Sequence, residues 1–278
     1  MKKPLVSILM TIHNHERFLK QSIKSVISQT FKNWELIAID NGSSDSSRKQ
    51  LKEIKDRRIK KKYLTRNIGR TNCLNYGLKF CKGKFIAILD SDDLAKKDRI
   101  KIQLKRMRDN KKLWLTASAY EVINENNLVV KKIYVNKNLY NPRKLINENI
   151  IAHSTVMYRR GLIEKIGNYP KNFKYAQDYA FYLKTFKKFD LEVIKNSLCK
   201  IRVSHANSET FRQSTTNLIT SEEIRLLYWS YKNFSLTKKE RIKSLFMMLK
   251  KIMKLLKLNN YSILIPLILL SLIVSFFL

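Results

Sequence analysis

Short apolar runs alternate with helix-like segments in the first third of the chain. The runs at 5–10, 34–39 and 85–89 each end in polar residues, which is typical of buried strands. Apolar residues recur at helical spacing between the first two runs, at Phe18, Leu19, Ile23, Val26 and Ile27. A polar helix over about 45–55, a strand near Tyr63 and a further helix continue the alternation. This βαβα order predicts an α/β fold with a mostly parallel central sheet.

The second half of the chain has a less regular pattern. It predicts a strand at 114–119, a hairpin near 125–127, a strand at 154–158 and a helix that carries Tyr179 and Tyr182 on one face. No internal repeat and no low-complexity linker separates these elements. We therefore expect them to belong to the same folded domain as the first half.

The carboxyl end of the chain changes character. From 238 to 258 apolar residues share one helical face and lysines lie mostly elsewhere, which is typical of a basic amphipathic helix. No charged residue occurs in 261–278. We expect a catalytic domain over 1–215, a helical, basic amphipathic segment over 216–258 and a hydrophobic, membrane-directed tail over 259–278. As a helix the tail reaches about 27 Å, slightly less than a hydrocarbon core of about 30 Å, so an in-plane anchor or a packing helix remains an alternative to a full span.

The net charge of +34 raises the possibility of nucleic-acid binding. Lysines are scattered over nearly every segment instead of forming one stripe, which is typical of a general compositional preference and argues against nucleic acid. The same charges can attract an anionic membrane, which the carboxyl end of the chain also favours. The three cysteines, Cys73, Cys81 and Cys199, form no C-x-x-C pair. They are typical of a protein of the reducing cytosol.

Carboxylates follow two of the expected strands. Asp40 ends the second strand, and Asp90-Ser91-Asp92-Asp93 ends the run at 85–89. Ligands of α/β sheets bind beyond the carboxyl ends of the strands. Crowded acids at one strand end favour a hard divalent cation, Mg²⁺ or Mn²⁺, which could hold a diphosphate. The alternative is that these acids cap a following helix, as Asp92 or Asp98 could.

Several separated segments resemble, in order, the family 2 glycosyltransferases of the GT-A fold, over about residues 4–210. Asp40-Asn41-Gly42-Ser43-Ser44-Asp45 is similar to the family's Asp-Asp-Gly-Ser-x-Asp, and Leu89 to Asp93 matches its metal motif. Further resemblance lies in the opening strand at Val6 to Asn14, in Asn67-Ile68-Gly69, in Ser154 to Arg160, in Gly167 to Tyr169 and in Gln177-Asp178-Tyr179.

The resemblance implies a GT-A-like nucleotide-diphospho-sugar transferase fold, with a nucleotide-sugar half at about 1–115 and an acceptor half at about 116–215. It assigns nucleotide-sugar binding to Thr11, Asn14, Asp40, Asn67, Gly69 and Asp90. It assigns the metal to Asp92, Asp90 and His205, although a lone histidine is more often a packed or solvated side chain. It places the catalytic base at Asp178, where the start of a helix also favours an ionised carboxylate; an ordinary helix cap is the alternative.

Three departures from the family pattern qualify this assignment. Asn41 stands where the family usually has a second Asp, and Gln177 stands where it usually has Glu. The Gln-x-x-Arg-Trp signature of processive members is absent, because no Arg-Trp pair occurs in the chain. This absence favours transfer of a single sugar over polysaccharide synthesis.

The resemblance and the residue pattern together predict an enzyme. It would transfer a single sugar, with inversion and with a divalent metal, from a nucleotide diphosphate sugar to a hydroxyl of a glycan or lipid-linked acceptor. A UDP-sugar is the favoured donor, and the expected place of action is the cytoplasmic face of the cell membrane, in cell-surface polysaccharide assembly. The alternative is a non-catalytic basic protein that binds membrane or nucleic acid on the same scaffold.

Overall fold

A computed structural model describes residues 3–133, 142–203 and 213–256 of the chain. His205 and the hydrophobic tail at 259–278 therefore lie outside the described residues. The chain divides into two compact units, which are taken separately below. The first consists of Met1–Pro142 with Ile151–Ser208, and the second of Arg143–Ile150 with Glu209–Leu278.

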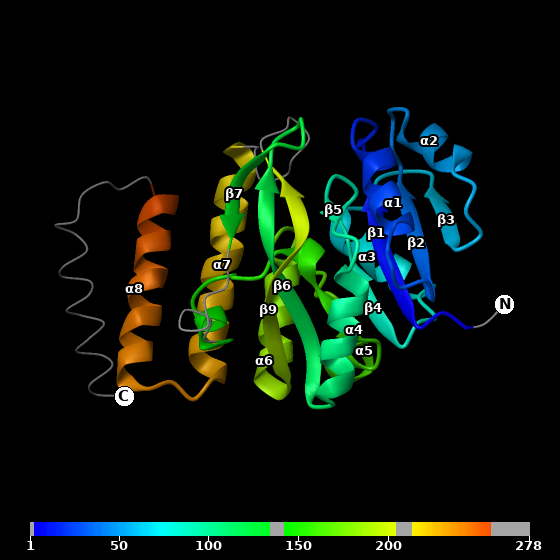
Figure 1. Cartoon of the computed structure of the whole chain (residues 1–278). Coiled ribbons are helices and arrows are strands. Elements are labelled where there is room, and N and C mark those ends of the chain that lie inside the picture. The colour runs from blue at the N-terminus through cyan, green and yellow to red at the C-terminus, as the bar shows by residue number, and fades with distance from the viewer. Residues whose placement is uncertain (1–2, 134–141, 204–212, 257–278) are drawn as a thin grey trace. The chain divides into compact units, whose positions relative to one another are not determined.

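A nine-stranded sheet forms the centre of the first unit (Figure 1). Its amino-terminal part has the order β3-β2-β1-β4, and all three strand pairs are parallel. These strands are β1 (Val6–Ile12), β2 (Trp34–Asn41), β3 (Ile59–Leu64) and β4 (Phe85–Ile88). The predicted α/β fold with its parallel strands is confirmed. Because β1 lies between β2 and β4, the loops after these strands gather at one edge of the sheet.

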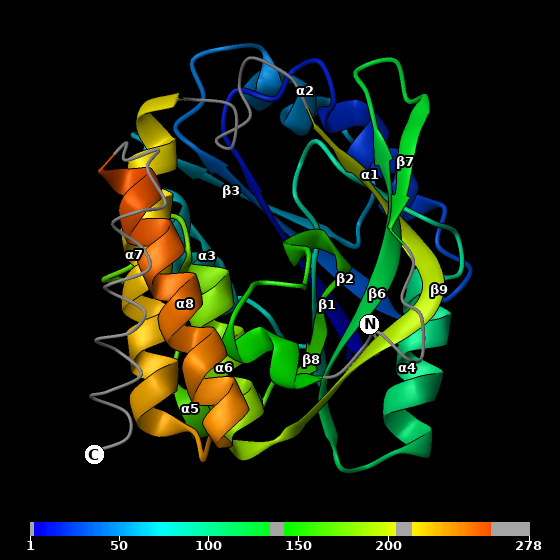
Figure 2. The ribbon, with the colours of Figure 1, turned by 90° about the vertical axis from the view of Figure 1, so that its left-hand side faces the viewer.

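The remaining strands extend the sheet beyond β4 in the order β8-β6-β9-β5, and β7 pairs with β6. They are β5 (Leu94–Ala95), β6 (Leu113–Ile123), β7 (Val129–Ile133), β8 (Met157–Arg159) and β9 (Asp190–Arg202). β4 and β8 are antiparallel, whereas the long strands β6 and β9 run parallel, side by side (Figure 2). The predicted hairpin near 125–127 is the β6-β7 turn.

Helices cover both faces of this sheet. One face packs against α1 and α4, because alternate β1 residues such as Ile8 and Met10 share a core cluster with Ile23 and Leu104. The other face packs against α3, whose Gly77 has no room for a Cβ beside Leu9. The helices of this unit are α1 (Leu19–Ile27), α2 (Ser47–Glu53), α3 (Arg70–Leu78), α4 (Arg99–Asp109), α5 (Leu162–Ile166) and α6 (Gln177–Lys188).

The structure corrects part of the expected second half. A short 3₁₀ helix, η2 (His153–Thr155), occupies the start of the strand predicted at 154–158, so β8 begins only at Met157. The sequence pattern also failed to reveal β9, the longest strand of the sheet. Its apolar and polar residues do not alternate regularly, because β9 pairs with β6 through several register shifts.

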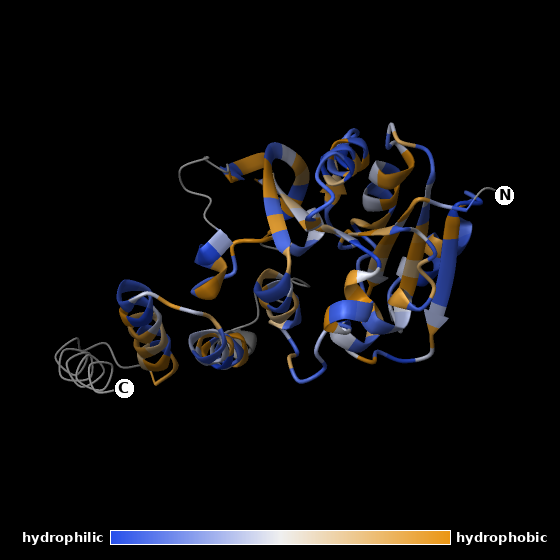
Figure 3. Ribbon diagram, turned by 90° about the horizontal axis from the view of Figure 1, so that it is seen from below, coloured by the Kyte–Doolittle hydropathy of each residue, from blue (hydrophilic) through white to orange (hydrophobic). Residues whose placement is uncertain are grey.

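The second unit contains η1 (Pro142–Ile146), α7 (Gln213–Asn233) and α8 (Lys238–Leu255). The first residue of η1, Pro142, still belongs to the first unit. A capping box between Thr237 and Glu240 starts α8. α8 packs beside α7, and Oγ of its buried Ser244 donates to Oδ1 of Asn147 at 2.8 Å. Hydrophobic and hydrophilic positions alternate around these helices (Figure 3). Phe246, Ile252 and Leu256 nevertheless remain exposed on α8.

Among the described residues, no helix is both long enough and apolar enough to span a membrane. The tail expected to reach the membrane falls outside those residues, so that expectation stays a prediction.

Candidate active site

The loop after β2 is built on a left-handed glycine and two asparagines. Gly42 has φ +68°, and a Cβ there would lie 2.4 Å from the main-chain carbon of Arg66. Asn41 joins the same two loops, because its Nδ2 donates to Oδ1 of Asn67 at 2.9 Å and its Oδ1 accepts from the main-chain N of Ile68 at 3.0 Å. The loops that precede α2 and α3 are therefore held together, and Asn41 fits its position because an amide can both donate and accept.

The loop after β1 joins this arrangement through Asn14. Asn14 has φ 56°, and its Oδ1 accepts from the main-chain N of Ser44 at 2.9 Å. Thr11 lies at the end of β1 in register with Ile39 of β2. Asn14 lies five residues before α1, which begins at Leu19, so it does not cap that helix. Asn14 instead fixes two loops at the sheet edge.

Asp40 lies beneath these loops and is fully buried. Its Oδ2 accepts from Nε of Arg48 at 2.6 Å, and its Oδ1 accepts from the main-chain N of Ser43 at 3.2 Å. Arg48 also donates to the main-chain O of Leu64. The predicted role of Asp40 in nucleotide-sugar binding stays a prediction, and its hydrogen bonds give it a second role in shaping the loop.

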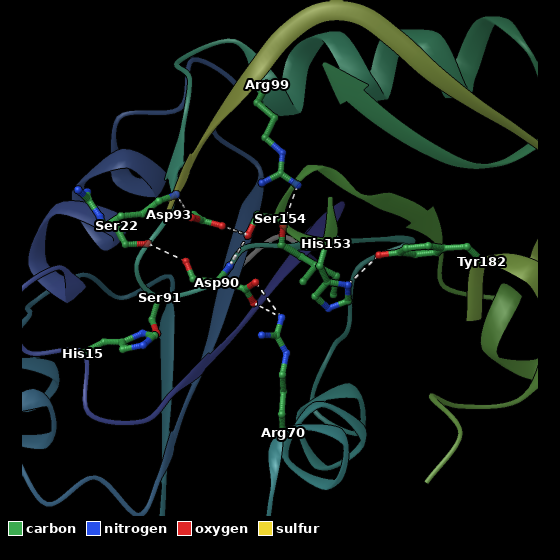
Figure 4. A network of polar contacts seen from close by, with 12 residues as sticks. His15, Ser22, Arg70, Asp90, Ser91, Asp93, Arg99, His153, Ser154 and Tyr182 are labelled. Atoms are coloured by element: carbon green, nitrogen blue, oxygen red, sulfur yellow. Dashed lines mark hydrogen bonds and ion pairs between the residues drawn. The ribbon is translucent and has the colours of Figure 1, made fainter. Parts of the chain in front are cut away.

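The carboxyl end of β4 brings Asp90 against Arg70 of α3 (Figure 4). Nη2 of Arg70 donates to both carboxylate oxygens of Asp90, at 2.7 and 2.8 Å. Burial disfavours the charged form of Asp90, but the charge and hydrogen bonds of Arg70, together with the nearby His153 and His15, lower the pKa of Asp90 below its ordinary value. Asp90 is therefore held as a carboxylate inside the protein.

Asp93 plays a different part from its neighbours. It is buried, and its carboxylate accepts from Oγ of Ser154 and from the main-chain N of Arg202, the latter at 2.7 Å. Burial, and then the charges of Asp92 and Asp90, raise the pKa of Asp93 well above its ordinary value. The sequence pattern treated the three acids as one cluster, whereas the structure makes Asp93 the junction of β4, η2 and β9.

Asp90 and Asp92 remain as oxygen donors for a divalent cation. Asp92 is partly buried, and its main-chain O accepts from Nε of Arg202 at 2.9 Å. No group of three His, Cys, Asp or Glu side chains suited to a metal occurs in the parts of the chain that the structure describes. Two carboxylates still fit Mg²⁺ or Mn²⁺, since such ions are usually bound by one or two carboxylates together with substrate phosphates. His205 lies outside the described residues and stays a prediction.

Asp178 is the second residue of α6, as its sequence setting predicted. Thr71 and Asn75 of α3 hold the segment before α6, because their side chains donate to the main-chain O of Phe173 and of Tyr169 at 3.0 and 2.8 Å. Burial raises the pKa of Asp178 to about 6, although the charge of Arg70 opposes the rise. α3 thus brings Asp90 and Asp178 within electrostatic reach of a single guanidinium.

Two histidines, His15 and His153, lie at the site, although the sequence pattern assigns them no role. Nδ1 of His15 lies 2.7 Å from Oγ of Ser91, between the candidate metal residues. Nδ1 of His153 lies 2.8 Å from Oη of Tyr182, which follows Asp178 by one helical turn. Single histidines in mixed segments give no sequence signal of this kind, because their partners are distant along the chain.

The family model for glycosyl transferase family 2 matches residues 7–167, more than half of the chain. The chain belongs to glycosyl transferase family 2. The prediction of a glycosyltransferase is confirmed. An Escherichia coli relative, named UDP-Glc:alpha-D-GlcNAc-diphosphoundecaprenol beta-1,3-glucosyltransferase, is 35% identical over 207 residues, which cover 73% of this chain and 79% of the relative.

Solved structures agree with this family 2 assignment at the level of fold. S. aureus TarS in complex with UDP-GlcNAc has a TM-score of 0.71 at 19% sequence identity, covering 93% of this chain and 75% of TarS. A mannosyltransferase of Pyrobaculum calidifontis in complex with GDP-Man and Mn²⁺ has a TM-score of 0.67 at 13% identity, covering 99% of this chain and 76% of that chain. The predicted GT-A-like fold is confirmed.

The junction at Asp93 leads to a prediction about stability. Oγ of Ser154 accepts from the main-chain N of Asp90 and donates to Asp93, so Ser154→Ala leaves two buried groups without a partner. We expect the free energy of unfolding to fall by about 1–3 kcal/mol. Urea denaturation followed by circular dichroism measures this change. Ser28→Ala, at an exposed serine, should change it by less than about 0.5 kcal/mol, and an equally small effect at Ser154 would contradict the assignment.

Proposed function

We propose that this family 2 glycosyltransferase transfers a single sugar, with inversion, from a nucleotide diphosphate sugar to an acceptor hydroxyl. The observation that carries the proposal is the placement of Asp90 and Asp178 around Arg70. One carboxylate lies at the strand end where a donor diphosphate is expected, and the other has a pKa suited to taking a proton near neutral pH. A donor and an acceptor could therefore meet between them.

In this reaction Asp178 accepts the proton of the acceptor hydroxyl. The hydroxyl oxygen then forms a bond to the anomeric carbon of the donor while the bond from that carbon to the diphosphate oxygen breaks. Attack from the side opposite the leaving group inverts the anomeric configuration. Burial of Asp178 makes it a stronger base than an exposed aspartate, because the neutral form is favoured once the proton is taken.

Asp90 and Asp92 would hold Mg²⁺ or Mn²⁺ together with the donor diphosphate. The bound cation supplies positive charge that offsets the negative charge of the leaving diphosphate. Arg70 pairs with Asp90 in the structure and is a second source of positive charge at the same place. The sequence of acids at the end of β4 and the oxygen chemistry of two carboxylates support this assignment.

The loops at the sheet edge would bind the nucleotide. The residues expected to bind it lie in or beside these loops: Thr11, Asn14, Asn67 and Gly69. Gly69 has φ +82°, and no atom lies within 4 Å of the position that a Cβ would take there. A UDP-sugar is the favoured donor, which the name of the Escherichia coli relative and the ligand of TarS support. The acceptor would be a glycan or a lipid-linked sugar, as in the name of that relative.

A lipid-linked acceptor would place the enzyme at the cytoplasmic face of the cell membrane, in cell-surface polysaccharide assembly. The amphipathic α8 supports this, since Phe246, Ile252 and Leu256 are exposed beside lysines such as Lys250 and Lys254. Such helices bind anionic lipid surfaces through both apolar contact and charge. The hydrophobic tail at 259–278 would add to the attachment.

The proposed reaction is tested by incubating the purified protein with UDP-glucose, UDP-N-acetylglucosamine and GDP-mannose, each with and without Mn²⁺ or Mg²⁺. Free nucleoside diphosphate is the readout, and glycan and lipid-linked sugars serve as acceptors. Release that depends on donor, metal and acceptor is expected. A protein that binds anionic vesicles but releases no nucleoside diphosphate from any donor would instead be a non-catalytic binding protein on the same scaffold.

The pKa of Asp178 predicts a pH profile. A base must be deprotonated, so the transfer rate should rise as the pH increases through about 6 and reach a plateau above it. Asp178→Asn should lower the rate by about 10²–10⁴-fold and remove this rise, while donor affinity measured by calorimetry stays close to that of the wild type. Glu164→Gln removes an exposed carboxylate and serves as the control. Unchanged transfer by the Asp178 variant would remove its role as base.

The metal assignment predicts a defect in Asp92→Asn. An amide carries no charge to balance a divalent cation, so we expect the metal to bind more weakly. The Mn²⁺ or Mg²⁺ concentration that gives half-maximal turnover should rise at least about tenfold. A metal titration of turnover measures this change. Asp109→Asn, at an exposed aspartate of α4, is the matched control. If the Asp92 variant keeps the wild-type metal dependence, Asp92 is not a ligand.

Membrane attachment predicts a difference between the full-length protein and a protein lacking residues 259–278. We expect the full-length protein to float with vesicles that contain phosphatidylglycerol, and the shortened protein to float less and to be released more readily by high salt, because α8, whose binding depends partly on charge, then holds it without the tail. Phosphatidylcholine vesicles are the control. Full-length protein that stays at the bottom of the gradient with anionic vesicles at low salt would contradict the attachment.

A further inference from the structure

His153 carries a buried polar atom that the proposed reaction leaves unexplained. His153 is 7% exposed, and its Nε2 is closed to solvent and has no hydrogen-bond partner among the described residues. A buried imidazole nitrogen without a partner is costly. Such atoms therefore indicate either strain or a ligand that supplies the missing bond.

The rest of the imidazole is fixed in place. Nδ1 lies 2.8 Å from Oη of Tyr182, and the ring makes an edge-on contact with Tyr169 at 5.6 Å between centroids. The neighbouring Ser154 bonds to the main-chain N of Asp90 and to Asp93. The short helix η2 is thus attached to the end of β4 on one side and to α6 on the other, so His153 cannot turn easily toward another partner.

The position of His153 points to the donor side of the site. Its ring lies beside the Asp90–Arg70 pair (Figure 4), and both of these charges act on its pKa. Burial lowers that pKa to about 3, so the imidazole is neutral and can either donate or accept, depending on the tautomer. A sugar hydroxyl can also donate or accept, and the proposed reaction places the donor sugar between Asp90 and Asp178.

We propose that Nε2 of His153 hydrogen-bonds a hydroxyl of the donor sugar and makes His153 a specificity-determining residue, with Tyr182 as the residue that positions it. This inference rests on the proposed function. Arg70 lies next to the imidazole in the structure and has a long, flexible side chain that is 28% exposed. Attraction of its guanidinium toward the donor diphosphate uncovers Nε2 without movement of the main chain.

The proposal is tested by calorimetry with two ligands for each protein, a nucleoside diphosphate and the corresponding nucleotide sugar. The pairs are UDP with UDP-glucose, UDP with UDP-N-acetylglucosamine, and GDP with GDP-mannose, and the pair used is the one whose sugar the wild type turns over. His153→Phe should bind the nucleoside diphosphate within about twofold of the wild type, but should bind the nucleotide sugar about 10- to 100-fold more weakly.

Two further variants separate the two ring nitrogens. The amide of His153→Gln reaches the position of Nε2 and should restore much of the affinity, whereas the amide of His153→Asn reaches only that of Nδ1 and should not. Tyr158→Phe removes a buried hydroxyl on β8 and should leave both affinities unchanged. A deoxy-sugar donor that binds the wild type weakly, but binds His153→Phe as well as the full donor does, identifies the hydroxyl.

Equal losses for both ligands in His153→Phe, or no loss for either, would overturn the role of His153 while the transferase activity of the wild type stands. Equal affinities of the Gln and Asn variants for the nucleotide sugar would also overturn it, and this comparison remains decisive if His153→Phe fails to fold. If the wild type binds none of the nucleotide sugars, the proposed function fails and this inference fails with it.

Discussion

The buried carboxyl group of Asp93 connects the elements of the first unit that carry the candidate active site. It accepts from Ser154 of η2 and from the main chain of Arg202 at the end of β9, while the main chain of Asp93 belongs to the loop between β4 and β5. A buried acid that lost either donor would be costly, so the three elements keep their mutual positions. Asp90 and His153 each lie beside this junction. Their geometry therefore follows from a residue that need never touch a substrate.

Arg70 imposes the second constraint, because one guanidinium serves two acids. It keeps Asp90 ionised against the effect of burial and limits the rise in the pKa of Asp178. Without this charge, burial would favour the protonated form of both carboxyl groups. A positive group on α3 thus allows the site to hold one carboxylate for binding and another, near its titration point, for proton transfer.

The sequence predicted the features that depend on local pattern. The parallel strands, the helices between them and the carboxylates at strand ends follow from periodicity and from the rule that α/β sites lie beyond strand ends. Asp92 and Asp93 could not be told apart in this way, because their difference depends on partners 61 and 109 positions away from Asp93. The role of His153 and the course of β9 were missed for the same reason. Family resemblance supplied what pattern could not, namely the candidate base at Asp178.

The second unit is assembled from two separate pieces of chain, and this affects how the protein is made. Arg143 and Asn147 bond to Glu240 and Ser244, in each case 97 positions later. At about 5–20 residues per second, a ribosome needs about 5–20 s to supply those partners. During that interval the eight-residue segment Arg143–Ile150 emerges from the ribosome without its final contacts, between parts of the sheet that can already pair. Completion of the fold is thereby linked to synthesis of the last helix, and a chain that ended early would be left with an unmatched insertion in its catalytic domain.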